Sequence, residues 1–122
     1  MILDYTQVKQ YLYNAGFKGI HLEAAIKIAY CESSFNTNAH NTNGEDSRGL
    51  MQINVDAHPE YSYLNLYDPE INSSIAYEIF TQTGNFSAWT CARRLGLVNP
   101  SNIIFGTALA FIGLALYISV AQ

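Results

Sequence analysis

Residues 29–36 read Ala-Tyr-Cys-Glu-Ser-Ser-Phe-Asn, and they place a carboxylic acid, Glu32, near the end of a helix predicted over 20–33. The apolar positions of that helix follow the i, i+3, i+4, i+7 spacing of one buried face and are Leu22, Ala25, Ile26 and Ala29. Glu32 follows Ala25 by seven residues and falls on the same face. Burial there would raise the pKa of its carboxyl group, which a general acid needs at neutral pH. Periodicity alone also allows Glu32 to be rotated into solvent, as most glutamates are.

Capping and helix-breaking residues outline the other helices. Asp4 and Gln7 have the spacing of a capping box, so a first helix begins there, and we expect it to end near Asn14. The sequence Asp-Pro-Glu at 68–70 begins another helix, which Gly84 ends. A short helix is expected over 87–95.

The segments between these helices predict a small second lobe. The stretch 36–47 is rich in Asn, Thr and Gly, which is typical of turns. Residues 49–54, Gly-Leu-Met-Gln-Ile-Asn, predict a strand or an extended segment beside the helix over 20–33. The expected fold is a mainly α domain with a short hairpin or extended lobe, followed by an apolar C-terminal helix.

Composition is consistent with one globular domain. The chain has 122 residues, 49% of them hydrophobic, and a formal net charge of -4. Charged residues make up 13%, about half the usual share, because none follows Arg94. The acidic balance and the lack of a basic stripe argue against nucleic-acid binding. No pattern in the sequence indicates a metal ion or another cofactor.

The two cysteines, Cys31 and Cys91, are far apart in the sequence, and neither belongs to a CxxC pair. We expect two buried free thiols, although an oxidising compartment would allow them to form a disulfide. The first residues, 1–4, lack the basic and apolar regions of a secretory signal. We therefore expect a different route if the domain acts outside the cytosol.

Several motifs together resemble one superfamily. Residues 29–36, Asn38-Ala39 and the Gly-Leu-Met-Gln-Ile of 49–53 resemble lytic transglycosylases and goose-type lysozymes. The sequence is more similar still to lysozyme-like domains embedded in phage tail and virion proteins, through 44–49, 57–61, 68–72, 76–78 and 86–90. The resemblance covers about residues 20–92. It implies a lysozyme-like α+β fold for 1–97 and cleavage of the β-1,4 bond between N-acetylmuramic acid and N-acetylglucosamine in peptidoglycan.

The resemblance also implies roles for individual residues. Glu32 would be the general acid and then the general base. Ser33 and Ser34 would support the helix end, and Gln52 with the backbone of 49–51 would hold the saccharide. Tyr77 would face the glutamate across the cleft, and Trp89 would stack on a sugar. Tyr77 and Trp89 are equally compatible with simple packing. The substrate-binding residues predicted in this way are Ser33, Gly49, Met51, Gln52, Tyr77 and Trp89.

Glu45 and Asp46 are the candidates for a second catalytic carboxylate, which many glycosidases use. They precede the Gly-Leu-Met-Gln segment, roughly where some goose-type enzymes carry aspartates, whereas Asn54 stands at a position where those enzymes can carry Asp. The alternative is that they cap a turn or pair with Arg48. Without a clear second carboxylate the sequence favours a lytic transglycosylase over a hydrolytic muramidase that uses water.

The last part of the chain contains an uncharged apolar run of 18 residues, 103–120. As a helix it would be about 27 Å long, close to the thickness of the hydrocarbon core of a bilayer. We predict that 98–122 is a transmembrane anchor, and the alternative is a helix buried in a core or a subunit contact. The expected partners are peptidoglycan, a lipid bilayer through 103–120, and virion proteins or a second copy contacting this tail.

The charges next to the tail conflict with a simple cellular topology. Arg93 and Arg94 precede the run and nothing basic follows it, so the positive-inside rule places the domain on the cytoplasmic side. A lipid-containing phage particle would remove the conflict, because its membrane need not share the orientation of the cell membrane. We expect a virion-associated membrane enzyme that acts on the periplasm and cell wall during infection. The alternatives are a structural membrane protein of the virion with a vestigial lysozyme fold and a holin-like protein.

Overall fold

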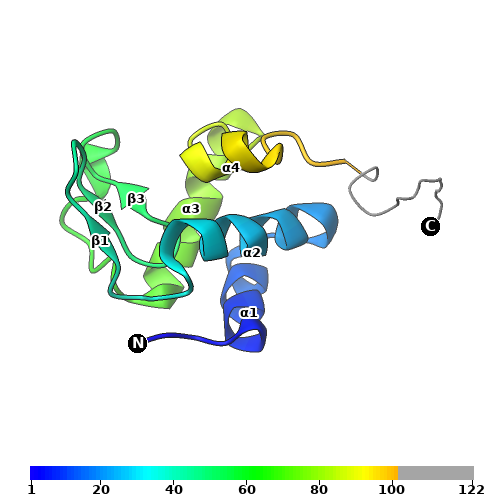
Figure 1. The fold of residues 1–122 in the computed structure, drawn as a ribbon, viewed down its shortest axis with the longest axis horizontal. Helices are drawn as coiled ribbons and strands as arrows, with labels where there is room; N and C mark the ends of the chain where they lie inside the picture. The colour runs from blue at the N-terminus through cyan, green and yellow to red at the C-terminus, as the bar shows by residue number, and fades with distance from the viewer. Residues whose placement is uncertain (102–122) are drawn as a thin grey trace.

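Four α-helices and three short strands make up the regular structure of residues 1–101, the part of the chain that this computed structural model describes. Figure 1 shows the strands grouped on one side of the domain and the helices on the other. The elements in chain order are α1 (Tyr5–Ala15), α2 (Gly19–Ser33), β1 (His40–Asn41), β2 (Ser47–Arg48), β3 (Ile53–Asn54), a 3-10 turn (Pro59–Tyr61), α3 (Pro69–Thr83) and α4 (Thr90–Leu95).

The helix boundaries follow from local capping, largely as predicted. The Asp4 carboxylate accepts from the Gln7 amide at 2.8 Å, and the Gln7 side chain accepts from the Asp4 amide at 2.9 Å, which completes the capping box of α1. The Asp68 side chain caps α3, and Gly84 ends that helix in the left-handed conformation. Helix α4 begins only at Thr90, later than predicted, because the Asn85 side chain accepts from the Ser87 amide and holds a turn there.

The strands form one antiparallel sheet in the order β1-β2-β3. His40 pairs with Arg48, and Arg48 pairs in turn with Ile53. The stretch 36–47, predicted to contain only turns, therefore includes β1 and the first residue of β2. These strands have two residues each and lack the apolar–polar alternation that would identify them in the sequence. Within 49–54 only Ile53–Asn54 is strand, and residues 49–52 form a turn.

The core lies where α1, α2 and α3 meet. The predicted inward face of α2 is confirmed, because Leu22, Ala25, Ile26 and Ala29 are all buried. An aromatic cluster fills the space between α1 and α3 and consists of Phe17, Tyr77, Phe80 and Phe86, with ring centroids 4.6 to 6.1 Å apart among the neighbouring pairs. The core ends near Leu97, which is buried, and Val98, whose carbonyl accepts from the Phe86 amide at 2.9 Å.

The expectation of free thiols is wrong. Cys31 and Cys91 form a disulfide with a Cα–Cα distance of 6.0 Å, and it joins the end of α2 to the start of α4. Their separation of 60 positions in the sequence gave no sign of this contact, which depends on how α4 folds back onto α2.

The predicted C-terminal helix over 103–120 lies outside the described residues. Within 1–101, no helix combines the length and the apolar character needed to cross a membrane.

Candidate active site

Glu32 occupies the penultimate position of α2, at the junction of this helix with α4 and the sheet. The helix ends because Ser34 and Phe35 both adopt left-handed backbone angles, with φ of 53° and 63°. Ser33 is buried, and its hydroxyl donates to the Ala29 carbonyl at 3.0 Å, one turn back in the same helix. Its support of the helix end stays a prediction. The sharp turn leaves the Glu32 side chain half-buried.

Burial is the main influence on the Glu32 carboxyl group. It raises the pKa of Glu32 above the ordinary value of 4.5, and the negative charge of Glu45 acts in the same direction. The Cys91 amide donates to Oε2 of Glu32 at 3.2 Å and lowers the pKa, as do the charges of Arg94 and Arg93. Burial outweighs these contacts. The carboxyl group is thus oriented as the periodicity of α2 predicts and holds its proton to a higher pH than an exposed glutamate.

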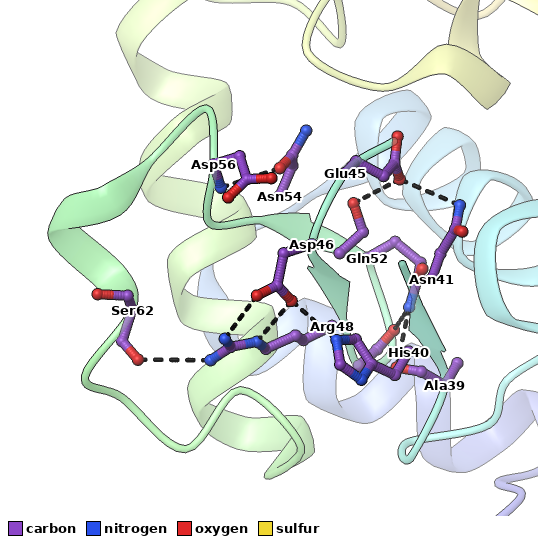
Figure 2. A network of polar contacts seen from close by, with 12 residues as sticks. Ala39, His40, Asn41, Glu45, Asp46, Arg48, Gln52, Asn54, Asp56 and Ser62 are labelled. Atoms are coloured by element: carbon purple, nitrogen blue, oxygen red, sulfur yellow. Dashed lines mark hydrogen bonds and ion pairs between the residues drawn. The ribbon is translucent and has the colours of Figure 1, made fainter. Parts of the chain in front are cut away.

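The two candidate second carboxylates have different environments in the sheet lobe, residues 40–54 (Figure 2). Asp46 receives hydrogen bonds from Arg48 at 2.9 and 2.8 Å and lies 2.8 Å from His40 Nε2. The hydrogen bond from Arg48 is the largest cause that lowers the pKa of Asp46 to about 2. Pairing with Arg48, one of the alternatives from the sequence, is therefore confirmed for Asp46.

Glu45 points to the other side of the same segment, as Figure 2 shows. Its Oε2 accepts from the Ser47 hydroxyl at 2.6 Å and from the Asn41 side chain at 3.2 Å. Because its charge raises the pKa of Glu32, Glu45 acts electrostatically on the candidate acid. Asp46, by contrast, forms an ion pair with Arg48 and a hydrogen bond with His40.

The 49–52 turn is held from three directions by side chains that bond to its backbone. The Asn72 side chain accepts from the Met51 amide at 2.8 Å, and the Trp89 indole donates to the Met51 carbonyl at 2.8 Å. The Gln52 side chain donates to the Gly49 carbonyl at 3.0 Å and to the Ala39 carbonyl at 3.1 Å. Gly49 is required here, because its φ is +80° and a Cβ would overlap the Leu66 carbonyl and the Asn72 side chain.

The structure brings most of the predicted binding residues to this turn, where they have internal partners. Met51 is fully buried, Trp89 is 3% exposed and Gln52 is 9% exposed. Tyr77 lies elsewhere: its ring meets Phe17 edge-on at 5.0 Å and packs against Gly16 at the end of α1. Tyr77 makes packing contacts, and Trp89 is buried with its indole hydrogen-bonded to Met51, so the roles of both residues in substrate binding stay predictions.

Asn72 is an important residue that the sequence analysis did not single out. It is fully buried, and its amide nitrogen also donates to the carbonyls of Arg48 and Leu66 at 2.9 and 2.8 Å. A signal was present in the sequence, since Asn72 shares the i, i+3, i+4, i+7 spacing with Ile75, Ala76 and Ile79 on the buried face of α3. A polar residue on such a face needs hydrogen-bond partners.

Two concave surfaces of the described domain do not have Glu32 among their lining residues. An apolar groove of about 630 Å³ lies beside α2 and is lined by residues that include Tyr5, Ile26, Tyr30, Cys31, Leu95 and Leu97. A small cavity of about 60 Å³ lies beside Trp89 and Gln52. Residues 1–101 contain no group of three or more His, Cys, Asp or Glu side chains placed to hold a metal ion.

The sequence also matches a known protein family. A family model described as a lysozyme-like domain matches residues 9–91, a span that contains Glu32, the 49–52 turn and Asn72. No curated protein matches the sequence. Since the family model covers well over half of the chain, the protein belongs to the lysozyme-like domain family.

Proposed function

We propose that this protein is a lytic transglycosylase that cleaves the β-1,4 bond between N-acetylmuramic acid and N-acetylglucosamine, with Glu32 as its single catalytic carboxyl group. Membership in the lysozyme-like domain family implies a peptidoglycan-degrading glycosidase. The observation that carries the finer proposal is the half-buried Glu32 carboxyl with its raised pKa at the junction of α2, α4 and the sheet lobe. The raised pKa leaves a larger fraction of Glu32 protonated at a given pH than an exposed glutamate would have.

The proposed reaction uses Glu32 twice. Protonated Glu32 donates its proton to the bridging oxygen as the bond between that oxygen and the anomeric carbon breaks. The resulting carboxylate then accepts the proton of the muramic acid C6 hydroxyl, whose oxygen bonds to the anomeric carbon. The products are a free hydroxyl on the departing sugar and a 1,6-anhydro ring, and no water is consumed. The Cys91 amide supports the carboxylate form that exists between the two steps.

The state of the second carboxylates supports a transglycosylase over a hydrolase. Both oxygens of Asp46 bind Arg48, and one of them also contacts His40, so Asp46 is poorly suited to activate water or attack a sugar. Glu45 is the observation that favours the second candidate, a hydrolytic muramidase, because its charge already acts on Glu32. In that case Glu45 would be the base that activates water.

For the biological setting we propose a membrane of a phage particle, with 103–120 as the anchor and virion proteins or a second copy as further partners. The uncharged 18-residue run and the similarity of the sequence to phage lysozyme-like domains support this setting. The alternative, a structural virion protein with a vestigial lysozyme fold, would have this anchor but no glycan-cleaving activity.

The test is digestion of purified murein by the full chain in mild detergent, followed by mass spectrometry of the released muropeptides. We expect anhydro-muramic ends that take up no label in ¹⁸O water. Labelled reducing ends would establish the muramidase instead, and Glu45→Gln should then abolish cleavage. Murein left intact by the wild-type chain would favour the vestigial fold.

A further inference from the structure

The Cys31–Cys91 disulfide involves the two residues that frame the Glu32 carboxyl group. Cys31 directly precedes Glu32 in α2, and Cys91 supplies the backbone amide that donates to Glu32 Oε2 at 3.2 Å. The hydrogen bond and the covalent bond therefore connect the same two segments, which are about 60 residues apart in the sequence.

The attachment of α4 explains why a covalent bond matters there. This helix has only six residues, and its N-cap, Trp89, provides no side-chain capping hydrogen bond. The amide of Cys91 can support Glu32 only while the start of α4 stays against the end of α2. The disulfide directly limits the distance between the end of α2 and the start of α4. The Trp89–Met51 hydrogen bond instead connects the start of α4 to the 49–52 turn.

Arg94 contacts both sulfur atoms of the disulfide. Its guanidinium nitrogens lie 3.7 Å from Cys31 Sγ and 3.8 Å from Cys91 Sγ, across the disulfide. The charged groups that act on Glu32 are Arg94 and Arg93 from α4 and Glu45 from the sheet lobe. Of the contacts that lower the pKa of Glu32, the Cys91 amide and Arg94 both depend on where α4 sits. Releasing α4 should therefore weaken both.

We propose that the Cys31–Cys91 disulfide is a positioning element for the reaction, because it holds the Cys91 amide on the Glu32 carboxyl group and the charged Arg94 beside the two sulfur atoms. The proposal rests on the role of Glu32 given under the proposed function. It assigns the disulfide an effect on the acid itself, in addition to its effect on the stability of the fold.

The test compares the full-length Cys31→Ser/Cys91→Ser variant with the wild-type chain, using the pH dependence of kcat/KM for murein cleavage. Loss of the amide and of Arg94 should raise the pKa of Glu32, so the alkaline limb of the profile should move up by about one pH unit. Misplacement of the acid should also lower kcat at the optimum by about tenfold or more while KM changes little. Wild-type protein reduced with dithiothreitol should behave like the variant, and reoxidation should restore it.

A destabilised control separates positioning from folding. Val8→Ala removes fully buried side-chain volume from α1, away from the active site, and should lower the melting temperature without moving the alkaline limb. An unchanged limb in the double variant would overturn the proposal and leave the disulfide a purely structural role. The same conclusion would follow if both the variant and the reduced wild-type chain failed to fold.

NMR titration of the Glu32 carboxyl carbon separates the proposed catalytic role of Glu32 from the positioning effect of the disulfide. It should report the same upward shift in the double variant whether or not the protein cleaves murein. If the wild-type chain is inactive but the pKa of Glu32 is still higher in the double variant, the proposed function is refuted and the positioning effect is retained.

Discussion

Glu32 and Asn72 are polar residues on otherwise apolar helical faces, and the protein compensates their burial to different degrees. Asn72 makes three hydrogen bonds to backbone groups, at 2.8 to 2.9 Å. The Glu32 carboxylate accepts one, from Cys91, within the described residues. Incomplete compensation keeps the pKa of Glu32 raised, so the property that suits Glu32 for catalysis also makes its ionisation unfavourable for the fold.

Replacing Glu32 by Gln should therefore separate activity from stability. We expect Glu32→Gln to lose at least about 10²- to 10⁴-fold in murein cleavage, the contribution of general acid catalysis. Because the folded-state pKa of Glu32 lies above its unfolded value, ionisation costs stability, and this cost is complete above the folded-state pKa. The variant should thus melt at the same or a higher temperature than wild type at pH 7. Near pH 3 the Glu32 carboxyl of the wild-type chain is protonated in both the folded and the unfolded state. The difference in melting temperature between the variant and wild type should therefore vanish there.

Activity assays and thermal unfolding at these two pH values provide the check. An active variant would contradict the assignment of the acid. A variant that is clearly less stable at pH 7 than at pH 3, relative to wild type, would contradict the electrostatic argument.

Asn72 and its neighbour Ser73 form a matched pair for testing the cost of buried polar groups. Asn72→Ala would leave the Met51 amide and the carbonyls of Arg48 and Leu66 without their partner, so we expect a loss of about 3 kcal/mol or more in the free energy of unfolding. The buried Ser73 hydroxyl has no hydrogen-bond partner among residues 1–101, and Ser73→Ala should be neutral or slightly stabilising. Urea unfolding measures both. Equal losses would show that the Asn72 hydrogen bonds contribute little.

At the scale of elements, local chemistry decided which parts of the fold could be predicted. Helices α1 and α3 have capping side chains and apolar stripes of helical period, both visible in the sequence. The strands have two residues each, and their pairing depends on the 49–52 turn, whose shape is set by Asn72 and Trp89 from distant parts of the chain. The disulfide and the Cys91–Glu32 hydrogen bond likewise depend on the docking of α4, which no local pattern indicates.

The sheet lobe should lose stability in acid through one carboxylate. The pKa of Asp46 is lowered to about 2 by Arg48 and His40, so its stabilising effect is present above its ordinary value of 3.8 and is lost as the pH falls toward 2. Asp46→Asn should melt below wild type at pH 7, and the two should converge near pH 2. The exposed Asp56→Asn serves as a control and should show a smaller difference at pH 7. A gap between Asp46→Asn and wild type that persists near pH 2 would argue against the ion pair as its source.

At the scale of the whole molecule, the apolar run follows the described domain in the sequence. Leu97 and Val98 complete the contacts of the core, and Leu95 and Leu97 also line the apolar groove of about 630 Å³. The uncharged run begins only a few residues later, at Ile103. Whether the run acts as a separate anchor can be decided by removing it.

A chain ending at Ser101 should fold without detergent and keep the murein-cleaving activity, whereas the full chain should partition into detergent or lipid. The core of the shortened chain would be intact, because Leu97 and Val98 remain. Thermal unfolding and clearing of a murein suspension are the measurements. If 103–120 covers apolar surface of the domain, its removal should expose several large side chains, at a cost of about 1.5 to 3 kcal/mol each. An aggregated or unfolded product would therefore refute the anchor.

The disulfide also makes residues 31–91 a covalent ring that contains Glu32, the sheet lobe and α3. Closing a ring of this size stabilises the folded chain by about 4 kcal/mol in the chain-entropy model. The loop at 42–44, after β1, is exposed and lies inside the ring, so a protease that cuts there would leave both pieces joined. An enzyme nicked at this loop would separate into fragments only after reduction, and it would retain the covalent link that joins the end of α2 to the start of α4.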